Sequence, residues 1–259
     1  MNTWAPRLRS AVRLPVAFLA FGCLAFASTI IVATGVDTTR GVSNLWINEQ
    51  GTDTQAYFTG VIEISVTDSS GHVFNRDSFC VDLFTDININ TQYNTTVLSP
   101  SQVPGKNLGR VSWLVDNALL PTQNSNYTSQ LPQADWVTTS AQGAGLQLAI
   151  WDIVHDNGDG FSSGSVQAAK NHTTTSSVLN WARTYETLSA NKDSNLAYIY
   201  QNVVLGGTTA VQMLAGPLFT DGGPAPVPEP STLACAAGAL VLIGLRVRKK
   251  RRRPASDPT

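Results

Sequence analysis

The chain has 259 residues and a formal net charge of −1, which hides a segregation of charge along the sequence. Seven of its 17 basic residues lie in 246–253 and three lie near the N-terminus, so residues 28–228 carry seven basic residues against 16 acidic ones. The resulting net charge of −9 disfavours binding to nucleic acid phosphates, whose affinity depends on Lys and Arg. At about 200 residues, this segment is long enough to bury a core as one domain.

The N-terminus has the parts of a secretory signal peptide. Three arginines precede an apolar run that ends in small residues suited to cleavage, namely Arg7, Arg9, Arg13, Leu14–Ala27 and Ala25-Phe26-Ala27. We therefore expect residues 1–27 to direct export through Sec-type machinery and then to be removed. A second possible cleavage site follows Ala33, and without any cleavage Leu14–Ala33 would remain as an N-terminal membrane helix.

The C-terminal end combines a Pro-rich motif, a short apolar run and a basic terminus, which are Val227-Pro228-Glu229-Pro230-Ser231, 232–245 and 246–253. Clustered Arg and Lys are costly to move across hydrocarbon, so we expect the basic end to stay cytoplasmic and everything before Pro228 to lie outside. The apolar run has 14 residues. A helix that spans a bilayer needs about 20, so the run suits a transient signal better than a lasting anchor.

The order of Pro228-Glu229-Pro230, apolar helix and basic end resembles the PEP-CTERM sorting signal of Gram-negative-type bacteria. In that family the signal, here 228–253, is recognised and processed by an exosortase, an integral-membrane enzyme thought to act like a cysteine transpeptidase. The resemblance implies a protein that a C-terminal transmembrane helix tethers during sorting and that then reaches the cell surface or extracellular matrix. The alternative is a plain tail anchor. Residues 216–227, with their Pro and Gly, predict a linker before the signal.

Between the two ends, residues 28–215 predict an α+β domain that is rich in β structure. Alternating β-branched and aromatic residues predict strands within 42–48, 55–66, 72–84, 93–98, 196–205 and 208–214. Apolar residues at helical spacing predict helices over 108–119, 139–154 and 176–188. From these periodicities we expect a core that includes Phe79, Val81, Trp113, Ile150 and Ile153.

Cysteine usage leaves one thiol in the exported domain. Cys23 lies in the signal peptide and Cys235 in the C-terminal apolar run, so Cys80 has no partner for an internal disulfide. Such a thiol is either buried as a small hydrophobic residue or used for its reactivity. The His and Cys residues show no metal-ligand spacing, so we expect neither a metal nor another cofactor.

Two short motifs, 67 residues apart, stand out within the predicted domain. Phe79-Cys80-Val81-Asp82 lies on a predicted strand, and Leu146-Gln147-Leu148-Ala149-Ile150-Trp151 lies on a predicted helix. Together they resemble the thioester domain of bacterial surface adhesins, over about residues 55–154. The resemblance implies that Cys80 supplies the sulfur and Gln147 the acyl group of an internal thioester, which forms with loss of ammonia.

A thioester is an activated acyl group, and an amine such as a partner's Lys attacks it to form a stable amide. Such a site needs water kept away, and we expect Phe79 and Trp151 to frame it. Asp82, which stands where the family usually has Glu, is expected to support the site. The alternative is that Cys80 packs as a core residue and Gln147 ties down a loop through its amide.

Weaker signals point to other classes of function. Gly160-Phe161-Ser162-Ser163-Gly164 matches a nucleophile elbow but follows an Asp/Gly turn instead of a buried strand. Residues 156–160 could offer oxygens to calcium, although a turn is the simpler interpretation. A polysaccharide-active hydrolase would need paired carboxylates, for which the candidates are Asp82, Asp86, Asp152 and Asp156. A carbohydrate-binding module would present exposed aromatic side chains, for which the candidates are Trp46 and Trp136.

These observations together predict an exported bacterial surface or matrix protein, sorted by an exosortase, that is not an enzyme. We expect it to act in adhesion or biofilm building, through the thioester. The alternative is a non-covalent structural module that binds a surface protein or polysaccharide.

Overall fold

The computed structural model describes residues 29–68, 71–83, 85–124, 127–204 and 210–217. In chain order its main elements are β1 (Thr29–Glu49), β2 (Thr52–Thr67), β3 (Val73–Cys80), β4 (Gln92–Leu98), α1 (Leu108–Leu114), α2 (Leu120–Gln123), α3 (Ser140–Asp156), β5 (Val166–Ala168), α4 (Ser176–Ser189), β6 (Tyr198–Val204) and β7 (Ala210–Gly216). No helix in these ranges is long and apolar enough to cross a membrane. The predicted signal peptide and C-terminal transmembrane helix lie outside the described residues.

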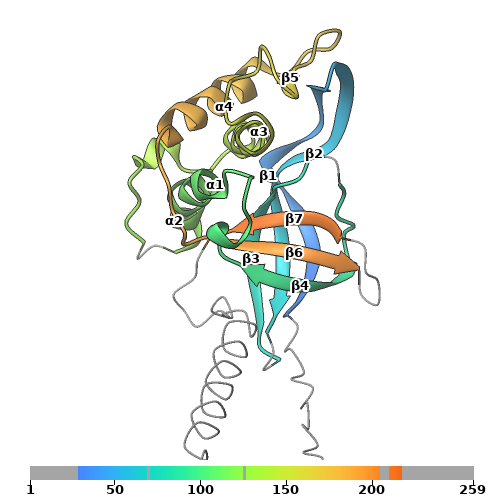
Figure 1. Cartoon of the computed structure of the whole chain (residues 1–259), viewed down its shortest axis with the longest axis vertical. Coiled ribbons are helices and arrows are strands. Elements are labelled where there is room, and N and C mark those ends of the chain that lie inside the picture. Colours follow the sequence, from blue (N-terminus) through green and yellow to red (C-terminus); the bar gives the residue numbers. More distant parts are fainter. Residues whose placement is uncertain (1–28, 69–70, 84, 125–126, 205–209, 218–259) are drawn as a thin grey trace, which may run out of the picture.

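Six of the strands form an antiparallel barrel, in the order β1-β2-β3-β7-β6-β4 (Figure 1). The barrel closes because the start of β1 pairs with two strands at once, so that Ile31 lies opposite both Val66 of β2 and Tyr93 of β4. Side chains alternate across a strand, so one face of each strand can share a single interior. That interior is formed by Ile31, Ala33, Ile62, Ile64, Val66, Tyr198, Tyr200 and Leu214.

The helices pack against the outside of the barrel, above β3, β6 and β7 in Figure 1. A second core fills this contact, where Phe79, Ile199 and Ala215 on the strands meet α1 and α3. The predicted core is confirmed, because Phe79, Val81, Ile150 and Ile153 are fully buried and Trp113 is 4% exposed. Helix α3 is apolar almost all round, as expected of a helix that lies between other elements on several sides.

The second half of β1 and the first half of β2 leave the barrel as a two-stranded ribbon, which β5 extends (Figure 1). A third core joins this ribbon to α3 and α4, with members that include Leu45, Ile47, Leu148, Trp151 and Val166. The ribbon begins where β1 is irregular, between Val36 and Gly41. The long strands therefore join the barrel and the helices into one packed structure.

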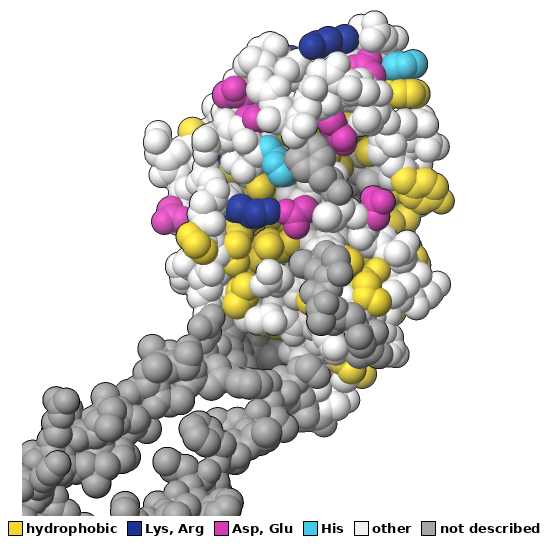
Figure 2. Space-filling view, turned by 45° about the vertical axis from the view of Figure 1, so that its right-hand side comes forward, with side chains coloured by type: hydrophobic (Ala, Val, Ile, Leu, Met, Phe, Trp, Pro, Cys, Tyr) yellow, Lys and Arg dark blue, Asp and Glu magenta, His cyan; other side chains and the backbone are white. Residues whose placement is uncertain are grey.

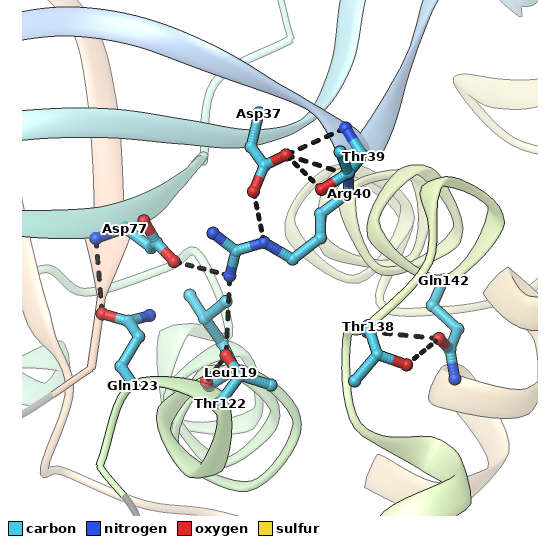
Figure 3. Close-up of polar contacts among 9 residues, drawn as sticks. All are labelled: Asp37, Thr39, Arg40, Asp77, Leu119, Thr122, Gln123, Thr138 and Gln142. Carbon is cyan, nitrogen blue, oxygen red and sulfur yellow. Dashed lines mark hydrogen bonds and ion pairs between the residues drawn. The ribbon is translucent and has the colours of Figure 1, made fainter.

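Arg40 lies at the junction between the barrel and the helices (Figure 3). Its Nε is 2.5 Å from Oδ2 of Asp37, and its Nη1 is 2.6 Å from Oδ2 of Asp77 on β3. The same Nη1 lies 3.5 Å from Oγ1 of Thr122 on α2. Burial raises the pKa of Asp77 even though Arg40 lowers it, so the carboxylate depends on this guanidinium for its charge.

The predicted β-rich domain with packed helices is confirmed, with three differences in its elements. The first strand begins at Thr29 instead of near residue 42, so residues 29–33 are strand and not the end of a membrane helix. The helix predicted over 108–119 continues to Gln123, because Pro121 lies in the first turn of α2, where no backbone N–H is needed. Strand β5 was not predicted, because its three residues are too short for a periodic signal.

Candidate functional site

Cys80 is the last residue of β3, just beyond the point where β2 stops pairing with β3. β2 pairs with β3 from Val73 to Ser78, whereas β7 pairs with it at Phe79 and Cys80, on the other side. The side chain of Gln147 takes the missing strand's place. The backbone N–H of Cys80 donates to Oε1 of Gln147 at 2.9 Å, and Nε2 of Gln147 donates to the carbonyl oxygen of Cys80 at 2.6 Å.

Helix α3 holds Gln147 firmly in this position. The helix starts at Ser140, and the residue before it, Thr139, is the N-cap, whose Oγ1 accepts a hydrogen bond from the backbone N–H of Gln142 at 3.3 Å. Gln147 itself is 1% exposed and lies among apolar residues on the same helix. A buried amide without partners would cost about 2 kcal/mol or more, so its two bonds to Cys80 explain how the helix accommodates it.

The two predicted motifs therefore meet in space, although not every motif residue lies beside the sulfur. Trp151 lies one turn after Gln147 and belongs to the core against which Cys80 packs. Its indole N–H is buried without a hydrogen-bond partner among the described residues. Phe79 lies in the other core, between barrel and helices, so strand alternation places it on the opposite face from the Cys80 side chain.

Asp82 braces the segment that follows Cys80. Its Oδ2 accepts from the backbone N–H of Met213 at 3.2 Å, and its carbonyl oxygen accepts from Nε2 of Gln212 at 2.5 Å. Its Oδ1 forms an ion pair with the ammonium of Lys106. Sequence reasoning did not find Lys106, because nothing near it in the sequence marks it as a partner of Asp82.

The electrostatic environment keeps the Cys80 sulfur neutral. Burial raises the pKa of the Cys80 thiol, and the charges of Asp82 and Asp86 raise it further. The same charges act on His155. Burial lowers the pKa of His155, and the positive charge of Lys106 lowers it further, whereas Asp82 raises it. Figure 2 shows Lys or Arg, Asp or Glu and His side chains gathered beside hydrophobic ones on one face of the domain. These surroundings therefore disfavour the charged thiolate of Cys80 relative to a neutral sulfur group.

The structure does not assemble the other predicted sites as expected. Trp46 is half-buried and stacks on His172, with ring centroids 3.6 Å apart. Trp136 is also half-buried and donates its indole N–H to the carbonyl oxygen of Leu131. Each ring is therefore partly covered by other residues of the domain.

The proposed carboxylate group is also arranged differently. Asp152 and Asp156 gather with Asp159, a residue that the hydrolase interpretation had not included. Ser162 lies in an exposed turn and not after a buried strand, so the nucleophile-elbow interpretation lacks its structural context.

Comparison with known protein families decides the sorting interpretation. Residues 226–252 match the family model described as PEP-CTERM protein-sorting motif. The chain carries a PEP-CTERM signal. The match includes Pro228, Glu229 and Pro230, which lie outside the described residues, and it supports an exported substrate of an exosortase that is membrane-anchored during sorting. No curated protein matches the chain. No solved structure matches it either.

Proposed function

We propose that this PEP-CTERM protein captures amines covalently at the surface or in the extracellular matrix, through a thioester between Cys80 and Gln147. The observation that carries the proposal is the pairing of the Gln147 carboxamide with both backbone polar atoms of Cys80. Only Cα and Cβ separate the backbone nitrogen of Cys80 from its sulfur, and the carbonyl oxygen is one carbon further away. The pairing therefore holds the acyl carbon of Gln147 close to the one thiol of the exported domain.

Thioester formation is an acyl transfer that needs no oxidant. Sγ of Cys80 attacks Cδ of Gln147, the bond from Cδ to Nε2 breaks, and the thiol proton leaves with the nitrogen as ammonia. During attack, negative charge develops on Oε1, which already accepts a hydrogen bond from the backbone N–H of Cys80. A donor placed in advance at the developing oxyanion lowers the barrier of such a step.

The surroundings suit a thioester better than a free thiolate. The raised pKa of Cys80 makes its thiolate scarce, so bond formation is expected to be slow compared with thiolate-activated sites. Once formed, the thioester carries no charge, and burial no longer opposes it. Gln147 and Trp151 are almost fully buried, which limits hydrolysis, whereas Cys80 is only half-buried, which leaves a side for an amine to approach.

Each thioester can react with an amine only once. An amine nitrogen attacks Cδ of Gln147, an amide bond forms, and the Cys80 sulfur leaves as a thiol after gaining the amine's proton. Such a reaction is stoichiometric anchoring and not turnover, so we propose an adhesive and not an enzymatic role. The acidic domain, with its net charge of −9, would favour approach of a Lys-rich partner.

Intact mass spectrometry of the exported protein tests the proposal. We expect a mass lower than the sequence mass of the processed chain by one ammonia. Methylamine should add one methylamine to that mass, at Gln147, and should free a titratable thiol at Cys80. Gln142 is a matched internal control, because it is buried on the same helix and should stay unmodified. Cys80→Ala should abolish both effects. A full unmodified mass in the native protein would disprove the thioester.

A further inference from the structure

Formation of the thioester removes one of the two hydrogen bonds that join α3 to Cys80. In the structure, Nε2 of Gln147 donates to the carbonyl oxygen of Cys80 at 2.6 Å. When Sγ of Cys80 bonds to Cδ of Gln147, the bond from Cδ to Nε2 breaks, and Nε2 leaves as ammonia with the thiol proton. The carbonyl oxygen of Cys80 then loses this donor, beside a side chain that is only 1% exposed.

The backbone of Cys80 points away from its remaining neighbour strand. The next residue, Val81, donates its backbone N–H to the carbonyl oxygen of Met213 on β7. In an antiparallel pair of strands, residues whose backbone groups bond to the neighbour alternate with residues whose groups point the other way, so the N–H and C=O of Cys80 face the side of Gln147. A buried carbonyl oxygen left without a donor is unfavourable, so the loss of Nε2 opposes thioester formation.

Trp151 holds a buried donor that lacks an acceptor. Its indole N–H has no hydrogen-bond partner among the described residues, and the side chain is 5% exposed. The ring lies in a core whose other members include Leu45, Leu148 and Val166. Buried polar groups without partners are rare in folded proteins, and each needs an explanation, such as a role in a reaction. A phenylalanine ring would suit an apolar core without this cost, so packing alone does not explain the indole.

Helix α3 places this donor on the side of the thioester site. Trp151 follows Gln147 by four residues. Residues four apart are neighbours on one face of a helix, with Cβ atoms about 5–6 Å apart. Helical side chains lean toward the N-terminus of their helix, so the indole of Trp151 leans over the turn that carries Gln147. Cys80 packs from β3 against the core that contains Trp151.

We propose that the indole N–H of Trp151 replaces Nε2 of Gln147 as the donor to the Cys80 carbonyl oxygen when the thioester forms. Trp151 is then a positioning residue of the site, and this role rests on the thioester proposed above. The exchange restores the donor that the carbonyl loses and supplies the acceptor that the indole lacks. Water would otherwise have to fill the gap, and a thioester lasts only where water is kept away.

Ammonium treatment of the exported protein gives both states of the site for comparison. Ammonia attacks Cδ of Gln147, the amide is restored, and the Cys80 sulfur leaves as a thiol, so the mass rises by one ammonia. In isotope-labelled protein with assigned resonances, the indole N–H signal of Trp151 should lie downfield in the thioester state and exchange more slowly with solvent. Ammonium should leave this signal unchanged in Cys80→Ala. A Trp151 signal that is the same in both states of the wild type would overturn the proposal.

Trp151→Phe keeps a ring in the core but removes the donor. After ammonium is removed, intact mass follows the renewed loss of ammonia, which should be about 5–30 times slower in Trp151→Phe than in the wild type, the factor expected for one missing hydrogen bond. Trp136→Phe is the matched control, because it removes an indole N–H that donates to Leu131, and it should lose ammonia at the wild-type rate.

The outcomes separate this role from the thioester itself. If the wild type loses ammonia and Trp151→Phe does so at the same rate, the role of Trp151 is refuted and the thioester stands. Wild-type protein that never loses ammonia refutes both. If Trp151→Phe does not fold, the comparison of the Trp151 indole signal in the two states of the wild type decides the role.

Discussion

Gln147 occupies, beside Cys80, the position that a neighbouring strand would otherwise fill. Its Oε1 accepts from the Cys80 N–H at 2.9 Å, and its Nε2 donates to the Cys80 carbonyl oxygen at 2.6 Å. A side-chain amide has the same donor and acceptor as a backbone peptide, so one residue of α3 can complete the edge of β3. This relationship stabilises the fold and also places an acyl group beside a thiol.

The structural part of this role can be measured without the sulfur. In a Cys80→Ala background, Gln147→Leu keeps similar volume but leaves a buried backbone N–H and C=O without partners. We expect the free energy of unfolding in urea to fall by about 2–4 kcal/mol. The exposed Gln201→Leu is the control and should change it by less than about 0.5 kcal/mol. Equal effects of the two substitutions would show that the pairing contributes nothing to stability.

Arg40→Met tests the junction between barrel and helices. The substitution leaves Asp77 buried without its guanidinium, so we expect a loss of about 3 kcal/mol at neutral pH. Arg183→Met, at an exposed position of α4, is the control and should have little effect. Urea unfolding monitored by tryptophan fluorescence measures both.

The cost of Arg40→Met should depend on pH with a definite sign. Without Arg40, the pKa of Asp77 in the folded protein should rise further above its ordinary value, because burial then acts unopposed. The folded state then holds a proton that the unfolded state releases above about pH 4, so stability falls as pH rises through this range. The variant should therefore lose less stability at pH 4.5 than at pH 8. A cost that is the same at both values would contradict this account of Asp77.

Gly143→Ala tests how closely α3 approaches β1. Alanine normally stabilises a helix interior relative to glycine by about 1 kcal/mol. Here a Cβ would lie 1.8 Å from the backbone carbonyl oxygen of Arg40, which cannot rotate away. We therefore expect the opposite sign, with destabilisation of about 2 kcal/mol or more. Ser177→Ala, exposed on α4, should be neutral or slightly stabilising. Thermal unfolding of both variants would reveal the reversal, and a stabilising Gly143→Ala would refute the close contact.

Replacement of Pro228, Glu229 and Pro230 by Ala should block C-terminal processing without blocking export, because the signal peptide is unchanged. Mass spectrometry of protein from the native cell should then find the basic end, 246–253, only in the variant. The matched control replaces Gly223 and Pro224 in the linker, outside the segment that matches the PEP-CTERM model, and should be processed normally. Wild-type protein that still carries 246–253 would show that the segment is only an anchor.

The sequence by itself determined the features that depend on local order or period. The Pro-Glu-Pro motif, the apolar run and the basic end follow one another directly in the sequence. The sorting signal could therefore be identified without the tertiary structure. Alternation placed Phe79 and Val81 in the core, and helical spacing located α3. These signals are local because each comes from backbone geometry over a few residues.

Tertiary structure alone decided which distant groups meet. Closure of the barrel through both edges of β1, the contact of Lys106 with Asp82, and the gathering of Asp159 with Asp152 depend on where long segments cross. No periodicity encodes such crossings, because they arise from packing of whole elements into shared cores. The meeting of Gln147 with Cys80 shows both levels: the sequence marked each residue as unusual, but only the departure of β2 from β3 opened the strand edge where the two could pair.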